Sequence, residues 1–149
     1  MISIEFNKKS LSSFYKYLKD LEGDVADFVR AEIEDSMLAI ESDAARDVRV
    51  DFGNLKNSIQ STPIKQSKNE ITGGVEVGAT YAPYIEFGTG GGVDVPTELE
   101  KFAIQFKGKT GRVRNFNADP FFYPAVFKQR QELPKRIEKT LKTLMNKNQ

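Results

Sequence analysis

The chain has 149 residues, 39% of them hydrophobic and 29% charged, so we expect one domain with a small core. It contains neither cysteine nor histidine, which excludes disulfides, thiolate or histidine metal sites, cysteine nucleophiles and Ser–His–Asp triads. The net charge of +1 hides an asymmetry. Residues 107–149 hold eleven basic and three acidic side chains, a local charge of +8, and residues 1–106 hold eleven basic and eighteen acidic, a charge of −7. Such a split suits nucleic-acid binding, or head-to-tail packing of copies through opposite charge.

The N-terminal half predicts a strand followed by helices. Apolar and polar residues alternate over residues 2–6, which is typical of a short strand. Over residues 11–48 apolar side chains recur every three or four positions, which predicts two helices, about 9–22 and 25–49, divided at Gly23. The second helix also carries acidic residues, which we expect to face solvent or another subunit: Asp27, Glu34, Asp35 and Glu41.

A β-hairpin is expected next, from Ser58–Gln66 and Glu70–Thr80. The second run alternates, with one apolar and one polar face. Pro63 has no backbone N–H, so the first strand should be an edge strand or be bulged there.

An aromatic segment, residues 81–87, precedes a glycine-rich loop and predicts one short helical turn. Gly88 should leave this turn with a positive φ, and Thr89 can bond to nearby backbone. Glu86 is unusual in an apolar run, so if buried it should meet backbone amides or an arginine. The remaining side chains of the segment are expected in the core: Tyr81, Tyr84, Ile85 and Phe87.

The C-terminal third contains two helical patterns and a basic segment. Thr97 and Glu100 predict a capping box before a helix at 99–106, for which a strand is the alternative. A final helix is expected over about 124–146, with Pro124 in its first turn and a break or kink at Pro134.

Two segments have few apolar anchors, Gly90–Val95 and Lys107–Asn117, and both are expected to be mobile loops that become ordered against a partner. The second segment concentrates positive charge on four side chains: Lys107, Lys109, Arg112 and Arg114.

Three blocks in order, residues 48–59, 81–89 and 118–125, resemble the minor tail-component family of long-tailed bacteriophages, the head–tail joining or tail-completion proteins. The resemblance covers roughly residues 25–146. Two positions depart from the family pattern: Phe52 stands where threonine is usual, and Asp119 where arginine is common. The residues that carry the resemblance are Gly53, Leu55, Ile59, Tyr81, Tyr84, Glu86, Phe87, Gly88, Thr89, Pro120, Phe121 and Pro124. In physical terms, Gly53 should supply a backbone shape that other residues avoid, Leu55 and Ile59 should be buried, and the prolines with Phe121 should form a stiff apolar corner.

We therefore predict an α+β fold, in which a long N-terminal helix packs on a small, mainly antiparallel sheet beside a C-terminal helix. The resemblance implies a structural virion protein of the phage neck, made in the host cytoplasm, without membrane contact, cofactor, metal or catalytic step. It implies a homo-oligomeric ring, with six copies as the family-based number, between the capsid connector or stopper and the tail terminator or tail tube. The basic side chains of residues 107–117 would meet an acidic helix of a neighbouring subunit or line the channel and contact genomic DNA.

Two alternatives from other classes stay open. One is a nucleic-acid-binding protein that uses the basic C-terminal third. The other is an enzyme with a carboxylate site at Glu98 and Glu100, which is disfavoured because residues two apart on a helix do not face each other.

Overall fold

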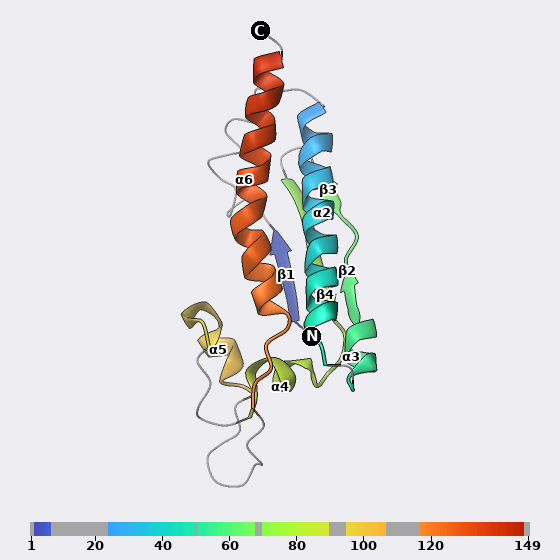
Figure 1. The fold of residues 1–149 in the computed structure, drawn as a ribbon, viewed down its shortest axis with the longest axis vertical. Coiled ribbons are helices and arrows are strands. Elements are labelled where there is room, and N and C mark those ends of the chain that lie inside the picture. The colour runs from blue at the N-terminus through green and yellow to red at the C-terminus, as the bar shows by residue number, and fades with distance from the viewer. Residues whose placement is uncertain are drawn as a thin grey trace.

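The computed structural model shows a two-layer α+β architecture, as predicted (Figure 1). Two long helices, α2 (Asp24–Asp47) and α6 (Tyr123–Lys147), lie side by side and run in opposite directions over one face of a small sheet. Shorter helices gather at the end where α2 stops and α6 begins. The structure describes residues 2–6, 24–49, 51–67, 70–89, 95–106 and 117–147.

Strand β4 (Glu70–Val77) is the centre of the sheet within these described ranges. It pairs antiparallel with β1 (Ile2–Phe6) on one side, and with β2 (Ile59–Ser61) and β3 (Lys65–Ser67) on the other. The predicted N-terminal strand and hairpin are therefore confirmed.

The predicted irregularity at Pro63 is a one-residue bulge between β2 and β3. Ser61 lies opposite Val75 and Lys65 opposite Thr72, so three residues of one strand face two of β4. The N–H of Thr62 still donates to the Gly74 carbonyl oxygen at 2.8 Å, so pairing resumes on both sides of a proline that cannot donate.

Helix α2 buries the apolar stripe that predicted it, from Val29 through Ile33 and Met37 to Ala44. The Met37 side chain of this helix packs on Gly73 of β4, where a β-carbon would overlap it. The absence of a side chain on Gly73 therefore leaves room for Met37. Glu41, expected on the acidic outer face, instead accepts hydrogen bonds from the N–H and hydroxyl of Ser61, at 3.0 and 2.8 Å.

Helix α6 packs on α2 through Leu133, Ile137 and Leu141, which are all buried. A break or kink is predicted at Pro134, and the break is wrong, because the helix continues through the proline. A proline inside a helix removes one backbone hydrogen bond, and the buried leucine and isoleucine on either side keep the helix against α2.

The remaining described elements are short: α3 (Gly53–Asn57), α4 (Ala82–Phe87), the 3-10 turn η2 (Thr97–Leu99) and α5 (Glu100–Ala103). The helical interpretation of residues 99–106 is thus favoured over the strand, but the capping box is wrong, since no side chain caps η2 or α5. The predicted helix 9–22 and most of both predicted loops, residues 90–94 and 107–116, lie outside the described residues. Among the helices that are described, none is long and apolar enough to cross a membrane.

Candidate assembly interface

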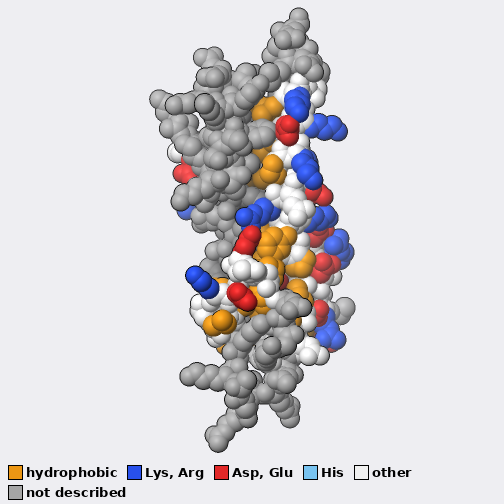
Figure 2. Space-filling view, turned by 90° about the vertical axis from the view of Figure 1, so that its left-hand side faces the viewer, with side chains coloured by type: hydrophobic (Ala, Val, Ile, Leu, Met, Phe, Trp, Pro, Cys, Tyr) orange, Lys and Arg blue, Asp and Glu red, His pale blue; other side chains and the backbone are white. Residues whose placement is uncertain are grey.

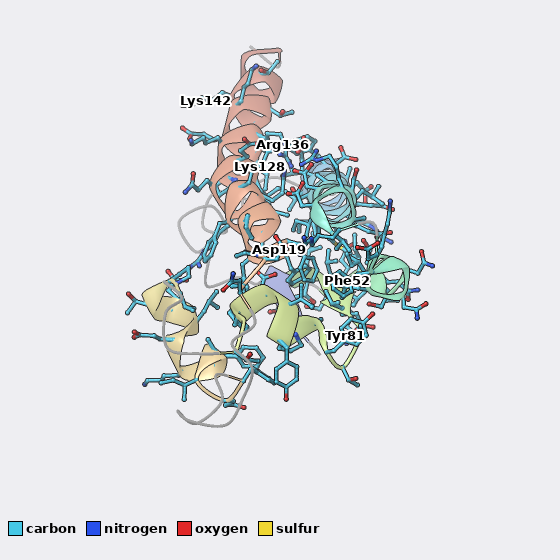
Figure 3. The ribbon with its side chains drawn as sticks, turned by 60° about the horizontal axis from the view of Figure 1, so that its bottom comes forward. Phe52, Tyr81, Asp119, Lys128, Arg136 and Lys142 are labelled. Atoms are coloured by element: carbon cyan, nitrogen blue, oxygen red, sulfur yellow. The ribbon has the colours of Figure 1, made fainter. Side chains whose placement is uncertain are left out.

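The three blocks that suggested the phage family meet at one end of the molecule (Figure 3). The ring of Phe52 lies 6.5 Å from that of Tyr81, which joins the first block to the second. Arg49 Nε lies 3.6 Å from Asp119 Oδ2, which joins the first to the third. The Asp119 N–H donates to the Ile85 carbonyl oxygen at 2.8 Å. The two departures from the family pattern, Phe52 and Asp119, thus each contact another block within the same chain.

Glu86 fixes α4 to the start of α6. Its side chain is buried, with 2% exposure, and its carboxylate accepts the backbone N–H groups of Phe121 and Phe122 at 3.0 Å and of Tyr123 at 3.1 Å. The first N–H groups of a helix lack partners within it, and a carboxylate there also faces the positive end of the helix dipole. The expectation that a buried Glu86 would find backbone amides is confirmed.

Burial raises the pKa of the Glu86 carboxyl, although the three N–H groups act in the opposite direction. Asp119 adds to the rise through charge repulsion. Burial and, less strongly, the charge of Glu86 also raise the pKa of Tyr123 to about 12. These groups hold two segments of chain together.

The glycines at this end behave differently from each other. Gly88 ends α4 with φ 68° and ψ 179°, a backbone conformation that is essentially restricted to glycine, so its positive φ is confirmed. The special backbone shape expected of Gly53 is wrong: its φ is not positive, and a β-carbon at this position would meet no atom within 4 Å. Gly53 simply begins α3, after which Leu55 and Ile59 are buried as predicted.

A cluster of aromatic rings joins α4, α5 and α6. The ring of Phe87 lies 5.4 Å from Tyr123 and 5.9 Å from Phe102, and Phe102 lies 5.2 Å from Phe106. Rings at these separations gain from tilted and edge-to-face contacts as well as from burial. The cluster therefore keeps the short helix α5 on the body of the molecule.

Two aromatic side chains that were expected in the core are instead exposed. Tyr81 is 37% and Tyr84 43% exposed, and the edge of Tyr84 packs on Phe106. Ile104, which follows α5, is 65% exposed. We call these three residues the apolar rim. Phe121 is buried between exposed Pro120 and Pro124, so the corner before α6 also has an apolar anchor and an outer surface.

Part of the charge asymmetry is neutralised inside the chain. Lys128 Nζ lies 2.9 Å from Asp43 Oδ2, and Arg130 lies 2.6 Å from Glu98, so basic side chains of α6 meet carboxylates of the N-terminal two thirds. The hydrogen bond from Lys128 lowers the pKa of Asp43. Figure 2 accordingly shows basic and acidic side chains interleaved along one face.

Arg136 makes the most extensive of these contacts, between α2 and α6 (Figure 3). Its guanidinium donates to Glu32 at 2.8 Å, to Gln129 at 3.1 Å and to the Ser36 hydroxyl. The sequence interpretation missed this network. Its signal is polar residues at helical spacing beside the apolar stripes: Glu32, Ser36 and Asp43 on α2, and Gln129 and Arg136 on α6.

The four basic residues Lys107, Lys109, Arg112 and Arg114 lie outside the described residues. In the ranges that are described, no group of three or more acidic side chains is placed to hold a metal ion. The main features of this end are therefore an exposed apolar rim and the Glu86 hydrogen bonds and aromatic contacts that hold it in place.

Comparison with known protein families places most of the N-terminal part of the chain in one family. The family model described as "Bacteriophage HK97-gp10, putative tail-component" matches residues 12–88, which include α2, the sheet hairpin and α4. No curated protein and no solved structure matches the chain. The family resemblance predicted from the three blocks is confirmed: the chain belongs to the HK97-gp10-like family of bacteriophage tail components.

Proposed function

We propose that this tail component is a structural protein of the phage neck, which forms a ring that joins the capsid connector to the tail. The observation that carries the proposal is the apolar rim at the end where the three family blocks meet. Tyr81, Tyr84 and Ile104 expose apolar surface, with Tyr84 packed on the aromatic cluster through Phe106, and exposed apolar surface is typical of protein–protein contact sites.

The rim is held in place before any partner binds. Glu86 fixes α4 to α6, and the ring contacts of Phe87 and Phe102 fix α5. A surface that is already ordered loses less conformational entropy on docking. In a symmetric ring the same modest contact is repeated by every copy, so the assembled joint dissociates rarely.

The partners that fit this role are further copies of the chain, with six as the expected number, and the neighbouring neck proteins. These are the connector or stopper on the capsid side and the tail terminator or tail tube on the other. Such a joint is part of the virion and requires neither a catalytic step nor a cofactor.

The test is a phage that lacks the gene, complemented with variants. Without the protein, we expect DNA-filled heads and finished tails that stay separate in electron micrographs. The double variant Tyr81→Ser, Tyr84→Ser should behave like the deletion, whereas Lys139→Ser, an exposed change on α6 away from the rim, should restore joined particles. Normal joining without the gene would overturn the proposal, and normal joining with the double tyrosine variant would exclude the rim.

The basic residues of segment 107–117 belong to the same proposal. We assign Lys107, Lys109, Arg112 and Arg114 to contact with the acidic α2 of a neighbouring subunit, which would fix the register of the ring. Replacing all four with serine should then leave tails unjoined or joints fragile. If joints form normally and only genome retention or ejection changes, the cluster lines the DNA channel instead. If neither changes, both roles are wrong.

Nucleic-acid binding is the alternative function. The ion pairs of Lys128, Arg130 and Arg136 engage basic side chains of α6 that a nucleic acid would need, which favours the structural role. Tight duplex binding by the purified chain, with a steep loss of affinity as salt increases, would support the alternative.

A further inference from the structure

The outer edge of β2 is a place where a strand of another chain could pair. Among the described strands, β2 and β3 pair with β4 on one side only, and they border the sheet at the right of Figure 1. A strand at the border of a sheet presents N–H and C=O groups that its own sheet does not use. How the chain treats these groups decides whether other copies can bind there.

Ser61 presents a backbone donor at this edge. Residues of an antiparallel strand alternate between bonding toward the partner strand and pointing away from it. Thr62 bonds inward, because its N–H donates to the Gly74 carbonyl oxygen at 2.8 Å. Ser58 also bonds inward, because its carbonyl oxygen accepts from the Gly78 N–H at 2.9 Å. Ser61 lies at an odd position between these two, so its N–H points away from β4.

Glu41 of α2 covers this donor. Its Oε2 atom accepts the Ser61 N–H at 3.0 Å and the Ser61 hydroxyl at 2.8 Å. Among the described residues no cation lies within 4.0 Å of the Glu41 carboxylate, so the contact with Ser61 is not part of an ion pair. Two residues further along, Pro63 has no N–H to offer. Neither position 61 nor position 63 therefore offers a free donor.

The surroundings of this edge would favour a strand that paired there. A groove of about 160 Å³ lies beside Ser61, and its lining includes Met37, Ile64 and Leu38, of which Leu38 is 54% exposed. An added strand would bury part of this apolar surface as well as form hydrogen bonds. Charged side chains commonly protect such an edge, but residues 58–64 contain none. The charge at β2 comes instead from α2.

We infer that Glu41 protects the β2 edge from pairing with strands of other chains. A strand that paired here would bring a carbonyl oxygen to the Ser61 N–H, where the Glu41 carboxylate now lies. The carboxylate would have to give up both of its hydrogen bonds, which makes the pairing unfavourable. Copies of the chain are thus directed to associate through other surfaces. This inference does not depend on the proposed ring.

Removing the carboxylate tests this protection in the full chain. In sedimentation over increasing concentration, Glu41→Ala should form species larger than any that the wild type forms. The concentration at which half of the chains are in such species should be at least about tenfold lower than for the wild type, in line with the loss of a charge-assisted hydrogen bond. Glu34→Ala is the matched control, because Glu34 gives the same helix the same charge and lines the same groove. It should associate like the wild type.

Hydrogen exchange reports on the donor itself. The Ser61 amide should be protected in the wild type, should exchange faster in dilute Glu41→Ala, and should become protected again when this variant associates. An unchanged rate in dilute Glu41→Ala would show that the carboxylate does not cover the N–H. Faster exchange without added association would show that the uncovered edge does not pair. Either result would overturn the inference.

A proline at position 61 separates edge pairing from a general loss of solubility. Ser61→Pro removes the donor, and β2 can accept the proline because this N–H does not bond to β4. The double variant Glu41→Ala, Ser61→Pro should therefore associate no more than the wild type, although it lacks the same charge as Glu41→Ala. If the double variant associates like Glu41→Ala, the association does not use the β2 edge and the inference is wrong.

Urea unfolding of each variant separates stability from association. If Glu41→Ala does not unfold cooperatively, Glu41→Met replaces it, because methionine keeps the length of the side chain, and Glu34→Met is then the control. If neither Glu41 variant folds, Glu41 maintains the fold and does not act as an edge protector. The proposed ring is judged separately, by whether the wild-type chain joins heads to tails.

Discussion

The carboxylate of Glu86 accepts a hydrogen bond from the backbone N–H of Phe122, 36 positions later in the sequence, at 3.0 Å. The same carboxylate accepts hydrogen bonds from the N–H groups of Phe121 and Tyr123. One side chain of α4 therefore binds three N–H groups at the start of α6. The apolar rim depends on this relationship, because α4 carries Tyr84 and α6 anchors the aromatic cluster on which α5 rests.

We expect the substitution Glu86→Gln to lower the free energy of unfolding by about 1–3 kcal/mol. The carboxyl group offers two oxygens to three N–H groups, and an amide offers one oxygen and an NH2 group, so at least one buried N–H would face another donor. Urea unfolding at a pH below the ordinary carboxyl pKa of 4.5, where burial of Glu86 carries no charge, measures the effect. Glu70→Gln, an exposed change on β4, is the control and should change stability by less than about 0.5 kcal/mol. Equal effects of both would show that the Glu86 hydrogen bonds contribute nothing specific.

The pH dependence of that difference follows from the raised pKa of Glu86. The folded chain keeps the proton at pH values where the unfolded chain, near the ordinary pKa of 4.5, has lost it. The stability that Glu86 contributes is therefore fully present below its pKa in the unfolded chain. It is lost as pH rises through its pKa in the folded chain. The free energy of unfolding of the wild type should exceed that of Glu86→Gln most at low pH. The difference should decline as pH rises. A difference that grows with pH would show that the N–H groups outweigh burial.

Two identical substitutions should have opposite effects at Gly88 and Gly53. Gly88→Ala forces a side chain into a conformation with φ 68°, at a cost of about 1–3 kcal/mol. Gly53→Ala meets no atom within 4 Å and has no positive φ, so restricting the unfolded chain should stabilise the protein by about 0.4–1 kcal/mol. Thermal unfolding of the two variants compares them directly. If Gly53→Ala were less stable than the wild type, a side chain at this position would be unfavourable in the folded chain.

The main elements of the fold could be predicted because their signals are local. The apolar period of α2 and the alternation along β4 each follow from one buried face, whatever the rest of the chain does. The Glu86 contact was also accessible, since a carboxylate in an apolar run must find donors if it is buried. In each case one stretch of sequence shows what has to be buried or hydrogen-bonded.

Features that depend on what packs against a segment could not be predicted in the same way. A short aromatic turn has the same pattern whether Tyr84 faces the core or solvent, and only the position of α5 decides it. Pro134 follows the local rule for a helix breaker, yet packing against α2 keeps α6 continuous. The pairing of Arg136 with Glu32 joins residues 104 positions apart.

That pairing gives the last prediction, which separates the charge of Arg136 from its shape. The guanidinium bonds to Glu32, Gln129 and Ser36 at once, and the last two side chains are buried. Arg136→Ala should lower the free energy of unfolding by about 2 kcal/mol, because buried polar groups lose their partner while the guanidinium itself is only partly buried. Arg136→Lys retains the charge but cannot reach three acceptors, so it should recover less than half of that loss.

A double-mutant cycle with Glu32→Gln tests the same point in urea unfolding. If the network acts as one unit, Glu32→Gln should cost less in the Arg136→Ala background than in the wild type. Arg46 is the matched control, since it also pairs with carboxylates but is mostly exposed, and Arg46→Ala should change stability little. If Arg136→Lys were as stable as the wild type, charge alone would explain the contact. If the cycle were additive, the hydrogen bonds of the buried serine and glutamine to Arg136 would not depend on the ion pair with Glu32.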